Sequence, residues 1–293
     1  MTFTALLTKE LRLRLRRERF IWLILTYLLV MGLLGFGFLL RANVFSGGYQ
    51  GYLLSLIGAQ LYALLSFIQL FLIIFIAPAF TATAINGEKE RQTFDLLLCS
   101  KLSAFSLLAG KLIAGLVNVL LLIAASIPLF SLVFFFGGVA PLQVLITLVI
   151  FIVTAIVVGT LSLCCSTLIH RPTASTAVAY TFCAFWLFAY PVISILTLGS
   201  SIQVNSRWFI WLQWLNAWNP ISALTSAVSG DQSATGNFYV FRVHVSPWVA
   251  FTLVSLVVSI LLFAISMAFV KPDQVGRFLP WFRYQSKKYE QSK

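Results

Sequence analysis

Charged and apolar side chains are closely interleaved in one segment between two long apolar runs. It reads Ile85-Asn86-Gly87-Glu88-Lys89-Glu90-Arg91-Gln92-Thr93-Phe94-Asp95-Leu96-Leu97-Leu98. Asn86 is placed to cap a helix, and Glu88 and Glu90 suit the first turn of that helix. Phe94 and Leu97 then share one apolar face. This pattern favours a short amphipathic helix that docks a partner protein, and a solvated connector is the alternative.

No catalytic constellation accompanies this segment. No stretch matches Gly-x-x-x-x-Gly-Lys-Ser/Thr, and Gly110-Lys111-Leu112 lacks both the upstream glycine and the hydroxyl residue of that phosphate-binding loop. The chain is therefore not expected to hydrolyse ATP. Its four cysteines form no spaced set with histidine, so we expect no zinc site and no other cofactor: Cys99, Cys164, Cys165 and Cys183.

The composition indicates a membrane protein. Hydrophobic residues make up 60% of the 293 residues and charged residues only 10%, whereas soluble domains carry about 25% charged residues. Inside a bilayer, backbone groups must pair internally, which leaves helices or closed barrels. The apolar runs are long and unbroken rather than short and alternating, so helices are favoured.

We therefore predict an all-α, polytopic membrane protein that forms one transmembrane domain over residues 1–293. Six transmembrane helices are expected, at residues 20–40, 53–76, 107–135, 142–168, 174–198 and 248–270. They leave a cytoplasmic segment at 1–19, a charged loop at 85–105, an external loop at 199–247 and a basic tail at 271–293.

The basic residues predict the orientation. Of the 20 Lys and Arg residues, 17 fall on the side that holds both termini, and only Arg41, Arg207 and Arg242 fall on the other. Cytoplasmic segments carry this excess, so both termini are predicted in the cytoplasm. Basic clusters that adjoin membrane spans are expected to touch anionic lipid headgroups, and nucleic-acid binding is not favoured.

Two segments outside the spans have a pattern of their own. Phe3, Leu7, Leu11 and Leu15 follow one helical stripe, interrupted by Arg14, which predicts an amphipathic interfacial helix. Residues 208–230 are uncharged but polar in places, and we interpret them as partly re-entrant or interfacial, with an ordinary external loop as the alternative. Four tryptophans of this segment are expected at headgroup level: Trp208, Trp211, Trp214 and Trp218.

Ionisable side chains are missing from the middle of the predicted spans, where proton relays and ion-coupled carriers place them. Uncharged polar residues remain, and they could line a translocation path: Gln60, Gln69, Asn118, Thr176 and Tyr180. Hydrogen bonds between helices are the commoner use of such residues, and that interpretation stays open beside the first.

The charged segment also resembles a known family. Its Glu88-Lys89-Glu90-Arg91-x-Thr93-Phe94-Asp95-Leu96-Leu97-Leu98 run, followed by Ser103 and Gly110-Lys111, is similar to the permease subunits of ABC-2 type transporters. Asn219-Pro220 resembles an Asn-Pro pair that the family often carries. Two departures stand out: Gln92 occupies a position where glycine is usual, and Lys101-Leu102 replaces a proline-containing pair.

The resemblance implies half of an exporter in the plasma (inner) membrane. Two permeases, as a homodimer or heterodimer, would sit on two ABC-type ATP-binding subunits. The N-terminal helix would be an interfacial connector, and the coupling contacts would come from one set of residues in the charged loop: Glu88, Lys89, Glu90, Arg91, Phe94, Asp95 and Leu97.

Two other classes of function remain open on the residues alone. One is a secondary carrier or channel that works without ATP, and the other is a membrane anchor or scaffold. A carrier would be expected to show inverted repeats, yet residues 20–135 and 142–270 share no convincing similarity.

Overall fold

The computed structural model describes residues 18–42, 51–90, 104–169, 171–199, 215–230, 238–240 and 243–270. Several predictions lie outside these residues. They include nearly all of the N-terminal interfacial helix, the basic tail, three of the four loop tryptophans, and four of the predicted coupling residues: Arg91, Phe94, Asp95 and Leu97.

Six long helices dominate the described residues, and each is long and apolar enough to cross a membrane. They are α2 (Glu18–Arg41), α3 (Gly51–Thr81), α6 (Ala104–Phe136), α7 (Pro141–Leu168), α8 (Pro172–Gly199) and α11 (Pro247–Val270). The shortest has 24 residues, or about 36 Å at 1.5 Å per residue, which exceeds the hydrocarbon thickness of about 30 Å. The predicted all-α fold with six spanning helices is confirmed.

Three short elements complete the described fold. Helix α4 (Asn86–Glu90) follows α3, and helix α10 (Pro220–Val228) precedes the last long helix. Strands β1 (Phe238–Val240) and β2 (Val243–Val245) form a small antiparallel hairpin in which Tyr239 lies opposite His244. Helix α10 and the hairpin belong to the predicted external loop.

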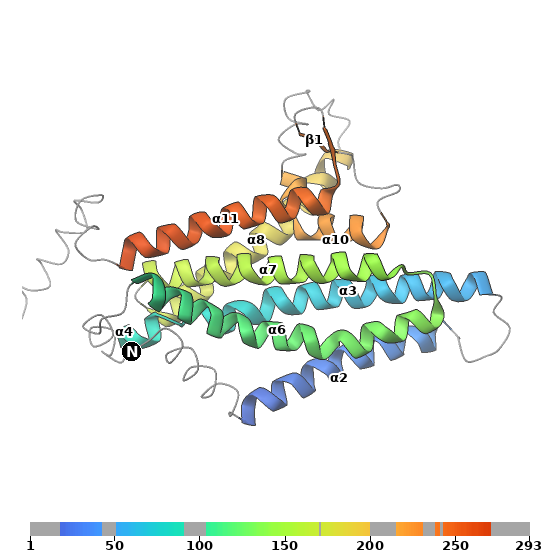
Figure 1. The fold of residues 1–293 in the computed structure, drawn as a ribbon, viewed down its shortest axis with the longest axis horizontal. Coiled ribbons are helices and arrows are strands. Elements are labelled where there is room, and N and C mark those ends of the chain that lie inside the picture. Colours follow the sequence, from blue (N-terminus) through green and yellow to red (C-terminus); the bar gives the residue numbers. More distant parts are fainter. Residues whose placement is uncertain are drawn as a thin grey trace, which may run out of the picture.

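Helix α7 occupies the middle of the bundle and packs against α3, α6, α8, α10 and α11 (Figure 1). In its most apolar 18-residue window 56% of the residues are buried, against 17% in α2 at the edge of the bundle. Small residues on α7, such as Gly159 against Leu116 of α6, allow this close packing. Helix α2 leaves Trp22 and Leu33 exposed, as a lipid-facing helix does.

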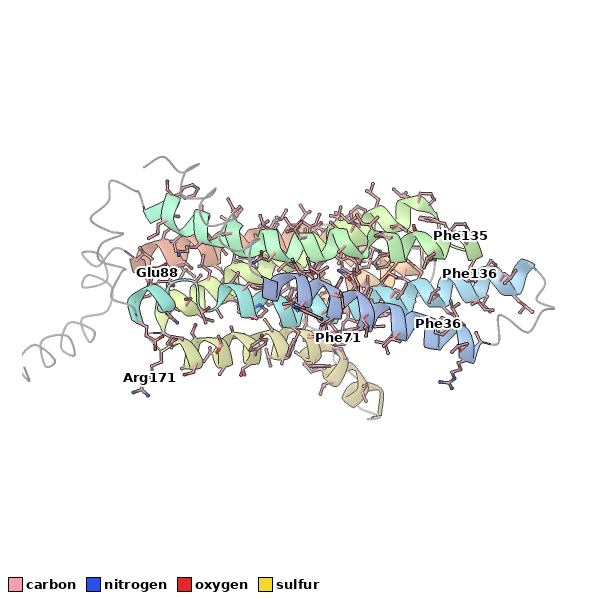
Figure 2. All side chains as sticks on the ribbon, turned by 90° about the horizontal axis from the view of Figure 1, so that it is seen from below. Phe36, Phe71, Glu88, Phe135, Phe136 and Arg171 are labelled. Atoms are coloured by element: carbon pink, nitrogen blue, oxygen red, sulfur yellow. The ribbon has the colours of Figure 1, made fainter. Side chains whose placement is uncertain are left out.

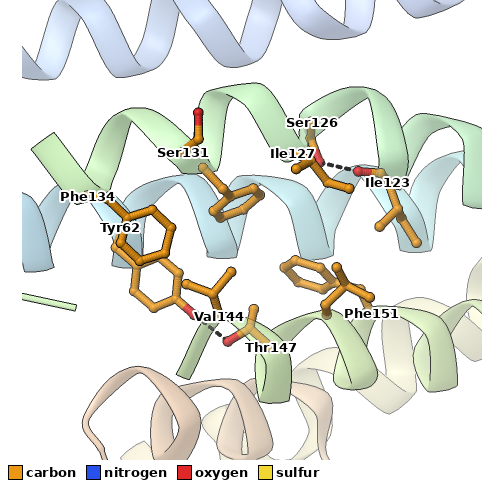
Figure 3. Close-up of a pocket in the computed structure, with 11 residues that line it drawn as sticks. Tyr62, Ile123, Ser126, Ile127, Ser131, Phe134, Val144, Thr147 and Phe151 are labelled. Carbon is orange, nitrogen blue, oxygen red and sulfur yellow. Dashed lines mark hydrogen bonds between the residues drawn. The ribbon is translucent and has the colours of Figure 1, made fainter. Parts of the chain in front are cut away.

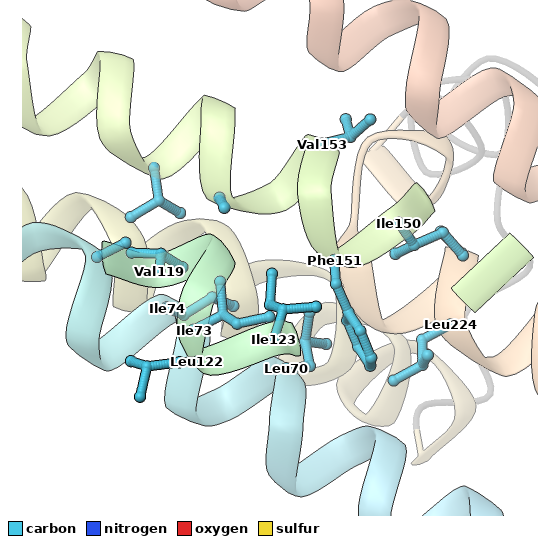
Figure 4. Packing of buried hydrophobic residues seen from close by; sticks show 14 of the residues in the cluster. Leu70, Ile73, Ile74, Val119, Leu122, Ile123, Ile150, Phe151, Val153 and Leu224 are labelled. Carbon is cyan, nitrogen blue, oxygen red and sulfur yellow. The ribbon is translucent and has the colours of Figure 1, made fainter. Parts of the chain in front are cut away.

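The core lies between α3, α6 and α7 (Figure 4). Leu70 and Ile73 of α3 face Leu122 of α6 and Phe151 of α7, and all four side chains are buried. Leu224 of α10 joins the same cluster, so the short helix is part of the packed bundle rather than an appendage. In lipid such close packing, and not exclusion from water, holds apolar helices together.

The two ends of the bundle differ. Glu88 and Arg171 lie at one end, whereas Phe136 and Phe36 lie toward the other (Figure 2). At the second end the turn between α6 and α7 places Gly137 and Gly138 at φ +76° and +82°. A Cβ at Gly138 would collide with the Ser55 carbonyl oxygen of α3, so this turn requires glycine.

One predicted boundary shifts in the structure. The second span was expected to end at residue 76, near Pro78, yet α3 continues to Thr81. Pro78 removes one helical hydrogen bond but does not end the helix, because Ala77 and Thr81 are buried against the bundle. The Thr81 hydroxyl donates to the Ala77 carbonyl at 2.8 Å, which adds a local bond at this turn.

Candidate functional site

Helix α4 is fastened to the end of α7 by one serine. The Ser166 hydroxyl oxygen accepts hydrogen bonds from the backbone N–H groups of Ile85 at 3.1 Å and Asn86 at 3.2 Å. A helix N-terminus leaves such groups unpaired, and here a side chain from another helix satisfies them. The prediction that Asn86 caps the helix is wrong, since its buried amide has no hydrogen-bond partner among the described residues.

Glu88 and Lys89 turn toward the bundle. Lys111 Nζ of α6 donates to Glu88 Oε1 at 2.8 Å, and the Lys111 side chain is 8% exposed against 28% for Glu88. Lys89 Nζ donates to the Thr167 carbonyl at 3.1 Å. That carbonyl belongs to the last turn of α7, where the helix dipole favours a cation. Both charges therefore fix α4 in place.

Glu90 differs from its neighbours because it is exposed. The structure thus divides the three described members of the predicted coupling set, Glu88, Lys89 and Glu90. Two are held against the bundle, whereas Glu90 lies at the exposed end of α4. Glu90 is therefore the member of this set that stays accessible on α4 among the described residues.

Sequence reasoning did not assign Lys111 or Ser166 to the site, although Gly110-Lys111 was part of the family resemblance. Lys111 is the only Asp, Glu, Lys or Arg between residues 102 and 170. A lone cation at the start of an apolar span needs a counter-charge, and that signal was available. Ser166 carried no signal, because a serine in an apolar run usually bonds to its own helix.

The five residues predicted to line a path do not gather in one place. Gln69 is fully buried on α3, and its Oε1 accepts a hydrogen bond from the Tyr27 hydroxyl of α2. Asn118 is buried on α6, whereas Gln60 is exposed on α3. Gln69 Nε2 and Asn118 Oδ1 have no hydrogen-bond partner in the described part of the chain.

The other two of these residues lie on α8. The Tyr180 hydroxyl donates to the Phe75 carbonyl of α3 at 2.9 Å, which is a bond between helices. Thr176 donates to the Thr173 carbonyl of its own helix at 2.8 Å. Gln69 and Tyr180 thus act in the way that polar residues commonly do in membrane bundles.

A separate cavity of about 130 Å³ lies between α3, α6 and α7 (Figure 3). The Tyr62 hydroxyl donates to the Gln143 carbonyl at 3.1 Å and contacts Thr147 Oγ1 at 2.6 Å. The residues that line this cavity are mainly apolar: Tyr62, Ile123, Ser126, Ile127, Phe130, Ser131, Phe134, Val144, Thr147, Leu148 and Phe151. None of the five predicted path residues lines it. The sequence did not distinguish the residues that line this cavity, because they have the composition of ordinary core residues.

The described cysteines have no reactive setting. Cys164, Cys165 and Cys183 are free thiols buried among the helices. Among the residues that the structure describes, no group of three His, Cys, Asp or Glu side chains could hold a metal ion.

Comparison with protein families identifies a match over most of the chain. The family described as ABC-2 family transporter protein matches residues 4–273. A comparison with curated proteins gives no significant match.

Proposed function

Since the chain belongs to the ABC-2 transporter family, we propose that it is the membrane-spanning permease subunit of an ATP-driven exporter. Members of this family are membrane transport components and are not themselves catalytic. The energy would come from a separate ATP-binding subunit, and a second permease, identical or related, would complete the translocation path. The match over residues 4–273 is the observation that carries this proposal.

We further propose that the end of the bundle that carries α4 faces the cytoplasm. The positive-inside rule supports this orientation, because 17 of 20 Lys and Arg residues belong to the side that holds α4 and both termini. In a bacterial cell this is the inner membrane with both termini inside. An ATP-binding subunit can then reach α4 directly.

Glu90 is the described residue that we assign to the docking contact. It is exposed on a helix whose neighbouring charges are already engaged with α6 and α7. A desolvated ion pair across an interface loses about 2–5 kcal/mol when one member is removed. Arg91, Phe94, Asp95 and Leu97 remain proposed members of the same contact.

The test is purification of the tagged full-length chain from native membranes, with Glu90→Lys as the variant. We expect the unaltered chain to recover a P-loop ATPase subunit and its ATP hydrolysis. Glu90→Lys should reduce that recovery about tenfold or more, while membrane insertion is unchanged. The matched control is Arg41→Glu, which reverses an exposed charge at the opposite end of the bundle. Equal recovery with both variants would remove Glu90 from the interface, and ATP hydrolysis by the chain alone would overturn the permease assignment.

A further inference from the structure

Helix α8 contains a proline that breaks its hydrogen-bond ladder. Pro191 lies inside the helix and has no N–H, so it cannot donate to the carbonyl four residues earlier, which is that of Leu187. In a membrane bundle a freed carbonyl must find another donor, because hydrocarbon offers none. The helix bends in its C-terminal part (Figure 2).

The missing donor comes from the external loop. Asn219 Nδ2 donates to the Leu187 carbonyl at 3.1 Å and to the neighbouring Trp186 carbonyl at 3.3 Å. The Asn219 side chain is 1% exposed, so water does not compete for these bonds. Its Oδ1 accepts from the backbone N–H of Ile221 at 2.8 Å and thereby caps α10.

Aromatic side chains also pack at this junction between α8 and the loop that precedes α10. Trp186 Nε1 donates to the Trp218 carbonyl at 2.9 Å, so α8 and the loop exchange hydrogen bonds in both directions. The two indole rings lie 5.8 Å apart, and the Trp186 ring also stacks on Phe251 of α11 at 6.3 Å. These rings keep the bonds of Asn219 in a low-dielectric setting, where a lost bond is costly.

We propose that Asn219 is a positioning residue. It donates the hydrogen bond that Pro191 cannot make, because proline has no N–H, and it thereby couples the position of α10 to the bend of α8. Helix α10 also packs on α3, α7 and α11. Loss of the Asn219 bonds to Trp186 and Leu187 is therefore expected to change the direction in which α8 continues after Pro191. The consequence for transport rests on the proposed permease function, but the bond exchange itself does not.

The test is a double-mutant cycle in the full-length chain purified into lipid nanodiscs. Asn219→Ser keeps a hydroxyl that can cap α10 but is too short to bridge to α8. It should lower the melting temperature by about 3–6 °C. Pro191→Ala restores the helical N–H, so the same serine substitution in that background should lower it by less than about 1 °C. The control background is Pro128→Ala, a proline inside α6, where the full loss should persist.

A second measurement reports on the seating of α10. Ser226→Cys places a near-isosteric thiol at a buried position of α10. In the described part of the chain, the hydroxyl that it replaces bonds to the Ala223 carbonyl of the same helix. Asn219→Ser should raise its maleimide labelling rate about tenfold, and Pro191→Ala should restore the low rate. If Asn219→Ser does not accumulate, rescue of its yield by Pro191→Ala is compared instead. Equal losses with and without Pro191 would overturn the proposal and leave the permease assignment untouched.

Discussion

Helices α4 and α10 contain five and nine residues, too few to be stable alone. Both are bound to a long helix by hydrogen bonds, but the bonds run in opposite directions. At each of them, one side chain makes two hydrogen bonds to backbone groups across the junction. At α4, Ser166 of a long helix accepts from two N–H groups of the short segment. At α10, Asn219 of the short segment donates to two carbonyls of a long helix.

The two junctions also differ in charge. The α4 junction adds an ion pair between Glu88 and Lys111 and a cation on the last turn of α7. The α10 junction has uncharged hydrogen-bonding groups, and aromatic rings cover it. Charged side chains are tolerated at α4 because Glu88 remains partly exposed to water. A charge beside Asn219 would be buried without a counter-charge. The comparison indicates that α4 is fixed by groups that solvent can influence, and α10 by groups that it cannot.

The largest expected effect at α4 comes from Ser166→Ala. This change leaves two buried backbone N–H groups without an acceptor, and we expect the free energy of unfolding to fall by about 2–3 kcal/mol.

The matched control is Ser162→Ala, one turn earlier on α7. Ser162 is equally buried, but among the described residues its hydroxyl donates to the Val158 carbonyl of its own helix and not to another helix. That control should change stability by about 0.5 kcal/mol or less. Thermal unfolding of the purified chain measures both, and equal effects would show that Ser166 does not hold α4.

A smaller effect is expected from the ion pair. Glu88→Lys or Lys111→Glu alone should cost about 1–2 kcal/mol, since Glu88 is partly exposed and solvent screens part of the loss. The charge swap, which combines both substitutions, restores an ion pair and should recover at least half of the stability and of ATPase co-purification. Recovered stability with assembly still lost would instead place Glu88 in the docking interface with the partner.

The long elements of the fold were predictable from the sequence, for a physical reason. A bilayer demands about 20 consecutive apolar residues. This requirement, together with the break at Gly137-Gly138 and Pro141 in the longest run, locates six runs that all become helices. The ends of the helices were less predictable. Helix α3 passes through Pro78 to Thr81, because burial against the bundle outweighs the one hydrogen bond that proline removes.

The contacts of the candidate site were mostly beyond the sequence. Glu88 and Lys111 are separated by 23 residues, and Ile85 and Ser166 by 81, so no helical spacing connects them. The charged segment identified α4 as special, yet it could not show which charges turn inward. The Asn219-Pro220 pair was noticed as a polar break in an uncharged segment and as a family resemblance, but its bonding partners could not be predicted because they are carbonyls of α8.

The smallest expected effect is a difference in salt sensitivity between the two junctions. Ala84, buried in the turn before α4, and Ser226, buried on α10, are each replaced by cysteine. The labelling rate with an uncharged maleimide is then followed by mass spectrometry of the peptide that carries the cysteine. Raising the salt from about 0.1 M to 1 M shortens the screening length from about 10 Å to 3 Å.

The rate at residue 84 should rise about twofold, because screening weakens the Glu88–Lys111 pair that holds α4. The rate at residue 226 should stay constant, since the described hydrogen bonds of Asn219 are between uncharged groups. Equal increases would indicate general loosening of the bundle, and no change at either position would mean that the Glu88–Lys111 pair does not control access to residue 84.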